Sequence, residues 1–128
     1  MLQSGRYAPS PRDFDHPLAY RLVDGAHDVF GDGTVVLVPT YGHTPGHQSL
    51  WVRSEHGPLV MTADACYTEA HLAEDRLSGV VWDAAEMAGA LATLRRLRDR
   101  DGAKILYGHD PAQWRTLPRP PTGLDGGS

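Results

Sequence analysis

Three segments of the sequence end in side chains that can bind a metal ion. A glycine-punctuated turn carries His47, an apolar run leads to Asp64, and a second apolar run leads to His109. Imidazole nitrogens and carboxylate oxygens are ligands that zinc takes in proteins. Each of the three residues lies at or just past a strand-like segment, where a loop can turn its side chain toward a shared site. The pattern therefore predicts a metal site built from these three side chains.

Each of these residues also has a plainer interpretation. A turn histidine often only hydrogen-bonds the backbone, and an aspartate after a strand often caps a helix. Gly42, Pro45 and Gly46, however, allow a sharp and rigid turn, which suits a metal ligand. An unpaired carboxylate at the end of an apolar strand is costly unless a cation neutralises it. His109 has the same two interpretations, with Asp110 as a candidate partner for its ring.

The composition limits the classes of protein that the chain can belong to. With 128 residues and 41% apolar residues, it fits one globular domain. The net charge of −4, from 12 basic and 16 acidic residues without a basic stripe, argues against a nucleic-acid partner. No apolar run approaches the roughly 20 residues that span a bilayer, so no membrane partner is expected. The single cysteine excludes an internal disulfide and predicts a cytoplasmic protein.

Local patterns predict the elements that must position these residues. Asp83 and Glu86 form a capping-box pattern that apolar residues follow at helical spacing, so a helix is expected over 83–100. Residues 68–82 give no clear assignment. Apolar and β-branched runs predict strands at 20–23, 34–38, 48–54, 59–62 and 104–107, with a hairpin turn at 56–58.

Segments with many proline or glycine residues lie on both sides of the part of the chain that is expected to fold. Prolines among polar and aromatic residues predict an irregular lead-in over residues 1–17. A partial domain is expected over residues 18–115. Residues 116–128 are rich in proline and glycine, and this composition predicts a disordered tail.

Three short motifs resemble those of a known family. Residues 42–47, 62–64 and 107–110 are similar to the later metal motifs of the metallo-β-lactamase fold hydrolases. They are most similar to those of the N-acyl homoserine lactonase group, whose members are quorum-quenching enzymes. Tyr67, three residues after the aspartate, resembles the tyrosine with which those lactonases contact the lactone. The likeness extends over roughly residues 14–115.

The resemblance implies an α/β fold, the C-terminal half of a metallo-β-lactamase-type αββα sandwich. It also implies that His47 binds one zinc ion, that His109 binds a second, and that Asp64 bridges both. A hydroxide held between the metals would attack the carbonyl carbon of an acyl lactone or related ester. Tyr67 would hold or polarise the carbonyl oxygen, and Asp64 could assist proton transfer to the leaving alkoxide. His43, in the same turn as His47, would support the loop.

The chain departs from the family pattern in its number of ligands. It contains no His-x-His-x-Asp-His motif, which supplies four further ligands in the family. A catalytic zinc normally has three protein ligands, so the chain offers too few for each metal. The missing N-terminal half would also leave one apolar face of the sheet uncovered. A homo-oligomer, or a partner that supplies this half, is therefore expected.

Two other interpretations of function stay open. The chain could be a non-catalytic fragment or a partner-dependent binding module. It could also belong to a glyoxalase-II-like thioester hydrolase, which shares the same pattern of histidine, aspartate and histidine. Tyr67 favours the lactonase interpretation, unless it is only a half-buried aromatic at the end of a strand. Cys66 is expected to be a small packing residue.

Overall fold

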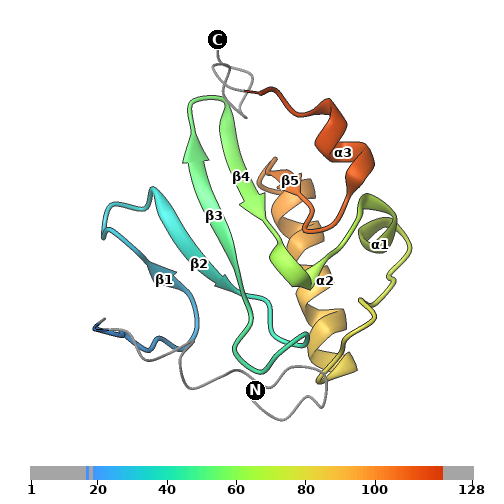
Figure 1. Cartoon of the computed structure of the whole chain (residues 1–128). Coiled ribbons are helices and arrows are strands. Elements are labelled where there is room, and N and C mark those ends of the chain that lie inside the picture. The colour runs from blue at the N-terminus through green and yellow to red at the C-terminus, as the bar shows by residue number, and fades with distance from the viewer. Residues whose placement is uncertain (1–16, 18, 120–128) are drawn as a thin grey trace.

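The computed structural model describes residue 17 and residues 19–119, and a five-stranded sheet lies at its centre (Figure 1). The strands lie side by side in chain order. All neighbouring strands are antiparallel except β4 and β5, which are parallel. Their bounds are β1 His27–Asp28, β2 Val35–Pro39, β3 Gln48–Ser54, β4 Gly57–Met61 and β5 Lys104–Leu106.

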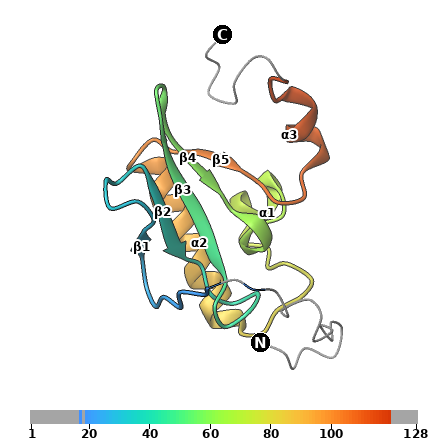
Figure 2. The same ribbon diagram turned by 60° about the vertical axis from the view of Figure 1, so that its left-hand side comes forward.

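Helices follow the fourth and fifth strands. They are α1 Glu69–Ala73, α2 Ala84–Asp99 and α3 Pro111–Thr116, and a 3₁₀ turn, Ala63–Ala65, follows β4 directly. α1 and α2 lie in the connection from β4 to β5, and α2 runs along one face of the sheet (Figure 2). None of the described helices is long and apolar enough to cross a membrane. The described part of the chain is thus a mixed α/β fold.

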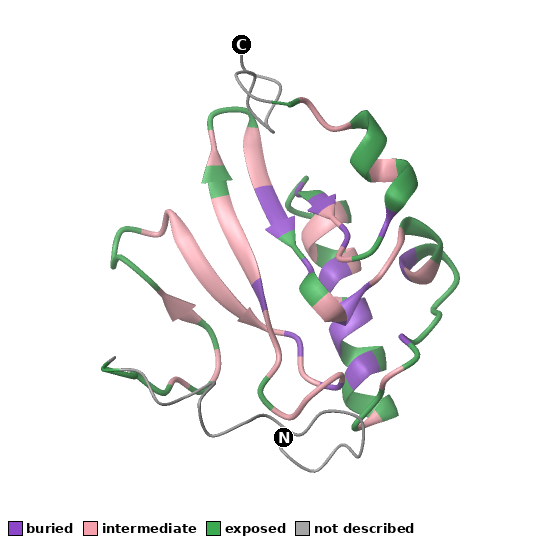
Figure 3. Cartoon of the chain, viewed as in Figure 1, coloured by how far each residue is buried: buried purple, intermediate pink, exposed green. Residues whose placement is uncertain are grey.

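The core lies between α2 and the sheet. Trp51, Val60 and Ile105 are paired neighbours on β3, β4 and β5, so their side chains share one face of the sheet. Leu94 of α2 is fully buried in the same cluster. Figure 3 shows that buried residues concentrate on α2, β4 and β5. Cys66 lies in this core as predicted, and burial raises the pKa of its thiol to about 11.

The opposite face of the sheet is also apolar. Strand pairing places Leu37, Leu50 and Met61 in one row across β2, β3 and β4, and none of the three is fully buried. At the edge of this face, Trp114 and Leu117 from α3 and its end line a hollow of about 240 Å³ together with Met61. This is the face for which the sequence predicts a covering partner, and that partner stays a prediction.

Most of the predicted elements are confirmed. The strands expected at 34–38 and 59–62 correspond to β2 and β4 with small shifts at their ends, and the strand at 48–54 is β3. The strand at 104–107 is β5, and the helix at 83–100 is α2. These segments have apolar local patterns, and β4, β5 and α2 bury the side chains that form the core.

Four segments differ from the prediction, and one of them is β1, a strand of two residues that the sequence analysis does not predict. Residues 20–23 form no strand, and Leu22 is 93% exposed, so this run has no surface against which to pack. α1 lies within the unassigned stretch 68–82, and α3 is a helix that the sequence analysis does not predict. Residues 1–16, 18 and 120–128 lie outside the described residues, and with them most of the expected lead-in and tail.

Replacing the residue that caps α2 is expected to destabilise the fold slightly. The side chain of Asp83 accepts a hydrogen bond from the backbone N–H of Glu86 at 2.9 Å, as the capping pattern predicted. Asp83→Ala leaves this N–H without a partner, so the free energy of unfolding should fall by about 1 kcal/mol. Urea unfolding measures this change. Asp101→Ala, at an exposed acid beyond the helix, should change it by less than about 0.5 kcal/mol, and equal losses would contradict the capping role.

Candidate functional site

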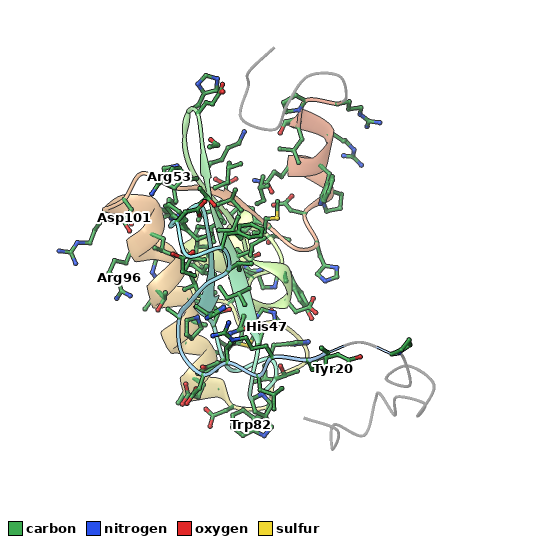
Figure 4. The ribbon with its side chains drawn as sticks, turned by 90° about the vertical axis from the view of Figure 1, so that its left-hand side faces the viewer. Tyr20, His47, Arg53, Trp82, Arg96 and Asp101 are labelled. Atoms are coloured by element: carbon green, nitrogen blue, oxygen red, sulfur yellow. The ribbon has the colours of Figure 1, made fainter. Side chains whose placement is uncertain are left out.

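A rigid turn between β2 and β3 holds His47. The backbone N–H of His47 donates to the carbonyl of Thr44 at 3.3 Å, and the N–H of Trp82 donates to the carbonyl of Gly42 at 2.8 Å. Gly42 has a φ of +132°, and a Cβ there would lie 2.4 Å from the backbone nitrogen of Met87. Only glycine allows this approach, which fixes the turn against the start of α2. His47 accordingly lies at the same end of the molecule as Trp82 (Figure 4).

The ring of His47 is held in one orientation. Its Nδ1 lies 3.2 Å from the carbonyl oxygen of Thr40, which can only accept, so Nδ1 carries the proton. Nε2 therefore has the lone pair, and it accepts a hydrogen bond from the backbone N–H of Asp64 at 3.2 Å. Burial, followed by the nearby His43, lowers the pKa of His47. The neutral imidazole that results is the form that binds metal ions.

Asp64 brings two imidazoles together. One of its carboxylate oxygens accepts a hydrogen bond from Nε2 of His109 at 2.8 Å, and the other lies 3.5 Å from Nε2 of His43. Ala63, directly before it, has a φ of +48°, which is uncommon for a residue with a side chain. A Cβ on Gly108 would lie 2.1 Å from the carbonyl oxygen of Ala63. The loops that carry Asp64 and His109 therefore touch at the backbone.

Backbone pairing also places Tyr67 beside His109. The N–H of His109 donates to the carbonyl of Tyr67 at 2.9 Å. The centroids of the two rings are 4.5 Å apart at an interplanar angle of 69°. Burial, followed by the charge of Asp64, raises the pKa of Tyr67, while a hydrogen bond with Ser78 opposes the shift. The hydroxyl of Tyr67 thus keeps its proton at neutral pH.

The structure brings together all four residues that the sequence singles out. His47 contacts Asp64, Asp64 contacts His109, and His109 stacks edge-on against Tyr67. The side chains of His109 and Asp64 are 59% and 41% exposed, so the cluster is open to solvent. Their roles as metal ligands and as a catalytic group stay predictions.

The cluster fits zinc in the kind of its donors but not in how they are grouped. It presents imidazole nitrogens and one carboxylate, which are donors that zinc takes in proteins. In the part of the chain that the structure describes, no three His, Cys, Asp or Glu side chains form a group that could hold a metal ion. A complete metal site therefore needs donors beyond this cluster.

The partners of His43 and Asp110 bear on the supporting roles that the sequence predicted for these two residues. Nδ1 of His43 donates to the carbonyl oxygen of Val80 at 2.8 Å, which agrees with the expected loop-supporting role. Asp110 is not bonded to the ring of His109. Its carboxylate instead accepts from the backbone N–H groups of Gln113 and Glu69, each at 3.0 Å, and so caps α3 and anchors the start of α1.

Sequence reasoning missed the polar residues that support the site. Ser78 is only 3% exposed, and its hydroxyl donates to the carbonyl of Asp64 at 3.3 Å. It lies in the stretch for which no element could be assigned. Thr40, Ser49 and Thr62 are buried next to the ligand-bearing loops. Only the strand pairing brings these residues together, so no local signal in the sequence could have found them.

Comparison with known proteins gives the same family at several levels. The model of the metallo-beta-lactamase superfamily matches residues 2–109. An N-acyl homoserine lactonase AttM of Azorhizobium caulinodans is 40% identical over 120 residues, which cover 89% of this chain and 46% of that protein. An N-acyl homoserine lactonase AiiA of Bacillus thuringiensis subsp. kurstaki is 32% identical over 97 residues, which cover 75% of this chain and 38% of that protein.

Solved structures agree with the sequence relatives. An N-acyl homoserine lactone hydrolase with its product N-hexanoyl-L-homoserine at the catalytic metal centre superposes with a TM-score of 0.70 and 29% identity. The superposition covers 80% of this chain and 40% of that one. The chain thus spans less than half the length of the relatives that it matches. The family match over most of its residues, together with this likeness of fold, shows that the chain belongs to the metallo-beta-lactamase superfamily.

Proposed function

We propose that the chain is part of a zinc-dependent hydrolase that opens N-acyl homoserine lactones. The observation that carries the proposal is the convergence of three segments that are distant in sequence. Nε2 of His109 lies 2.8 Å from a carboxylate oxygen of Asp64, and the N–H of Asp64 lies 3.2 Å from Nε2 of His47. The relatives with a similar sequence and fold are named as an N-acyl homoserine lactonase and an N-acyl homoserine lactone hydrolase.

His47, Asp64 and His109 are the residues that would hold zinc. Zinc supplies Lewis acidity and lowers the pKa of water toward ~7. His47 contributes an Nε2 lone pair whose direction is fixed by the bond from Nδ1 to Thr40. Asp64 contributes the negative charge, and its carboxylate could take the proton that the attacking water loses and pass it to the leaving alkoxide. The further donors come from a preceding segment or from a second copy of the chain.

Tyr67 would act on the substrate carbonyl. Its ring lies against His109, and burial raises the pKa of its hydroxyl, so the group is a hydrogen-bond donor at neutral pH. A donor aimed at the carbonyl oxygen stabilises the negative charge that develops on this oxygen when the carbonyl carbon is attacked. This residue is also what favours a lactone over a thioester as the substrate.

The experiment that tests the function measures metal content and substrate choice on one sample. Zinc per chain is determined by elemental analysis after dialysis, the oligomeric state by light scattering, and hydrolysis with N-hexanoyl homoserine lactone and with an S-acyl glutathione. We expect lactone opening that a chelator abolishes and zinc restores. A zinc-loaded protein that opens no lactone, or that prefers the thioester, would contradict the proposal.

Tyr67→Phe is expected to lower kcat for the lactone by about 100-fold to 1,000-fold, because it removes one donor to the developing oxyanion. The bound zinc should be unchanged, since the hydroxyl is not a ligand. Steady-state kinetics and elemental analysis check both parts. Tyr20→Phe is the matched control, because the side chain of Tyr20 is 63% exposed. Equal kcat values for the two variants would rule out the catalytic role of Tyr67.

A further inference from the structure

Three buried hydroxyl groups form a chain that ends at the ring of His47. Thr40, Ser49 and Thr62 lie at the ends of the adjacent strands β2, β3 and β4, and none is more than 1% exposed. The hydroxyl oxygens of Thr40 and Ser49 are 2.8 Å apart, and the hydroxyl of Ser49 lies 3.1 Å from the carbonyl oxygen of Thr62. The hydroxyl of Thr40 also lies 3.0 Å from Nδ1 of His47.

The direction of each hydrogen bond in this chain follows from its far end. The carbonyl of Thr62 can only accept, so the single hydroxyl proton of Ser49 is directed to it. The Ser49 oxygen must then accept at its other contact, so the hydroxyl proton of Thr40 is directed to Ser49. The Thr40 oxygen must in turn accept from Nδ1 of His47. This row of hydrogen-bonded hydroxyls therefore favours the tautomer of His47 with its proton on Nδ1.

The same row of hydrogen-bonded residues also contacts the other two segments of the candidate site. The hydroxyl of Thr62 donates to the carbonyl of Cys66 at 2.8 Å, and the N–H of Gly108 donates to the same carbonyl at 3.1 Å. Thr62 lies two residues before Asp64, and Gly108 lies directly before His109. One set of buried polar contacts thus links the loops that carry all three candidate ligands.

We propose that Ser49 is a positioning residue that directs the Thr40 hydroxyl away from His47 and so keeps the Nε2 lone pair facing Asp64. Only the consequence for zinc rests on the proposed function, because the tautomer is a property of the metal-free chain. Without the Ser49 hydroxyl, the Thr40 proton is free to point at Nδ1 of His47. This contact favours the other tautomer, in which Nε2 carries the proton and cannot bind a metal through a lone pair.

The loss of Ser49 should weaken this preference rather than abolish it. Two contacts still favour the proton on Nδ1 in the variant, because the carbonyl of Thr40 accepts it at 3.2 Å and the N–H of Asp64 donates to Nε2 at 3.2 Å. The two tautomers are then expected to coexist. Because the residues are buried, water does not simply replace the lost partner. Removing the Thr40 hydroxyl as well should restore a single tautomer, since only the carbonyl then contacts Nδ1.

The test observes the ring nitrogens of His47 directly. Long-range ¹H–¹⁵N spectra of the metal-free 128-residue chain are recorded at about pH 8, well above the ordinary imidazole pKa of ~6.5. The unmodified chain should show the proton on Nδ1. Ser49→Ala should show a mixture, and the double variant Ser49→Ala with Thr40→Val should return to Nδ1. A role in stability alone predicts that the double variant is more perturbed than the single one.

A second serine on the same strand serves as the control. Ser54→Ala removes a hydroxyl that donates to the carbonyl of Gly57, on the same strand but at the hairpin, and should leave the His47 spectrum unchanged. A single tautomer in Ser49→Ala, or a mixture that persists in the double variant, would overturn the inference. If the variants show a mixture and its recovery as expected, the inference is upheld.

Zinc titration separates this inference from the proposed function. Ser49→Ala should lower zinc affinity by about tenfold, as expected for a residue that orients a ligand. Zinc that leaves the His47 signals unshifted would contradict the proposed metal role of His47, while the tautomer result would still support the hydroxyl chain. Zinc that shifts these signals equally in both proteins, with equal affinity, would contradict the role of Ser49 and leave the metal site standing.

Discussion

Asp64→Asn is expected to lower the zinc affinity of the chain by more than about 100-fold and to abolish lactone opening. Loss of a residue that only orients a ligand already costs about 10-fold to 100-fold, and Asp64 is proposed to be a ligand itself. The substitution keeps the size of the side chain but removes its negative charge. It also leaves one oxygen, instead of two, to face the rings of His43 and His109. Competition with a colorimetric chelator measures the affinity.

A second aspartate serves as the control for the chemical change itself. Asp99→Asn makes the same substitution at the end of α2, where the carboxylate is exposed and pairs with Arg98. Zinc affinity and turnover should be unchanged in that variant. If Asp64→Asn retained zinc as the unmodified chain does, Asp64 would not be a ligand. The contact with His109 would then be an ordinary surface hydrogen bond.

Segments with a strong local pattern could be predicted from the sequence. The helix 83–100 carries the periodicity of its element and buries the face that the pattern marks, whereas the strand 48–54 alternates less cleanly and fully buries only Ser49. The run 20–23 has similar residues but no neighbour, and the structure leaves Leu22 exposed there. α3 is short and has no buried residue, so its only signal was the cap Asp110 followed by proline at the first turn.

Some residues of the candidate site could likewise be predicted from the sequence, and others could not. The three candidate ligands could be found because each lies close to a strand end, and Tyr67 because its place after Asp64 resembles that of the lactonase tyrosine. Their supporting residues could not, because the contacts between Thr40, Ser49 and Thr62 depend on how three strands pair. A buried serine in a strand has no pattern that distinguishes it from any other serine. Sequence reasoning therefore reached the candidate ligands but not the contacts that orient them.

Gly108→Ala is expected to damage both the fold and the site, because two backbones meet at this glycine. The added Cβ would lie 2.1 Å from the carbonyl oxygen of Ala63 and 2.8 Å from its carbonyl carbon. Backbone atoms cannot rotate away as the end of a side chain can, so the two loops must separate by about 1 Å. Overpacking of this kind costs about 1–3 kcal/mol, and each kcal/mol lowers the melting temperature by roughly 4–8 °C in a small domain.

The effect on the site should exceed the effect on stability. Gly108 precedes His109 and Ala63 precedes Asp64, so the separation acts directly on the 2.8 Å contact between these two side chains. A displacement of about 1 Å in a catalytic arrangement can cost 100-fold in rate. Zinc affinity and lactone turnover should therefore fall even at temperatures where calorimetry shows a folded protein. Gly79→Ala is the control, because nothing lies within 4 Å of its added Cβ. Unchanged zinc binding in a folded Gly108→Ala protein would mean that this close approach does not set the distance between Asp64 and His109.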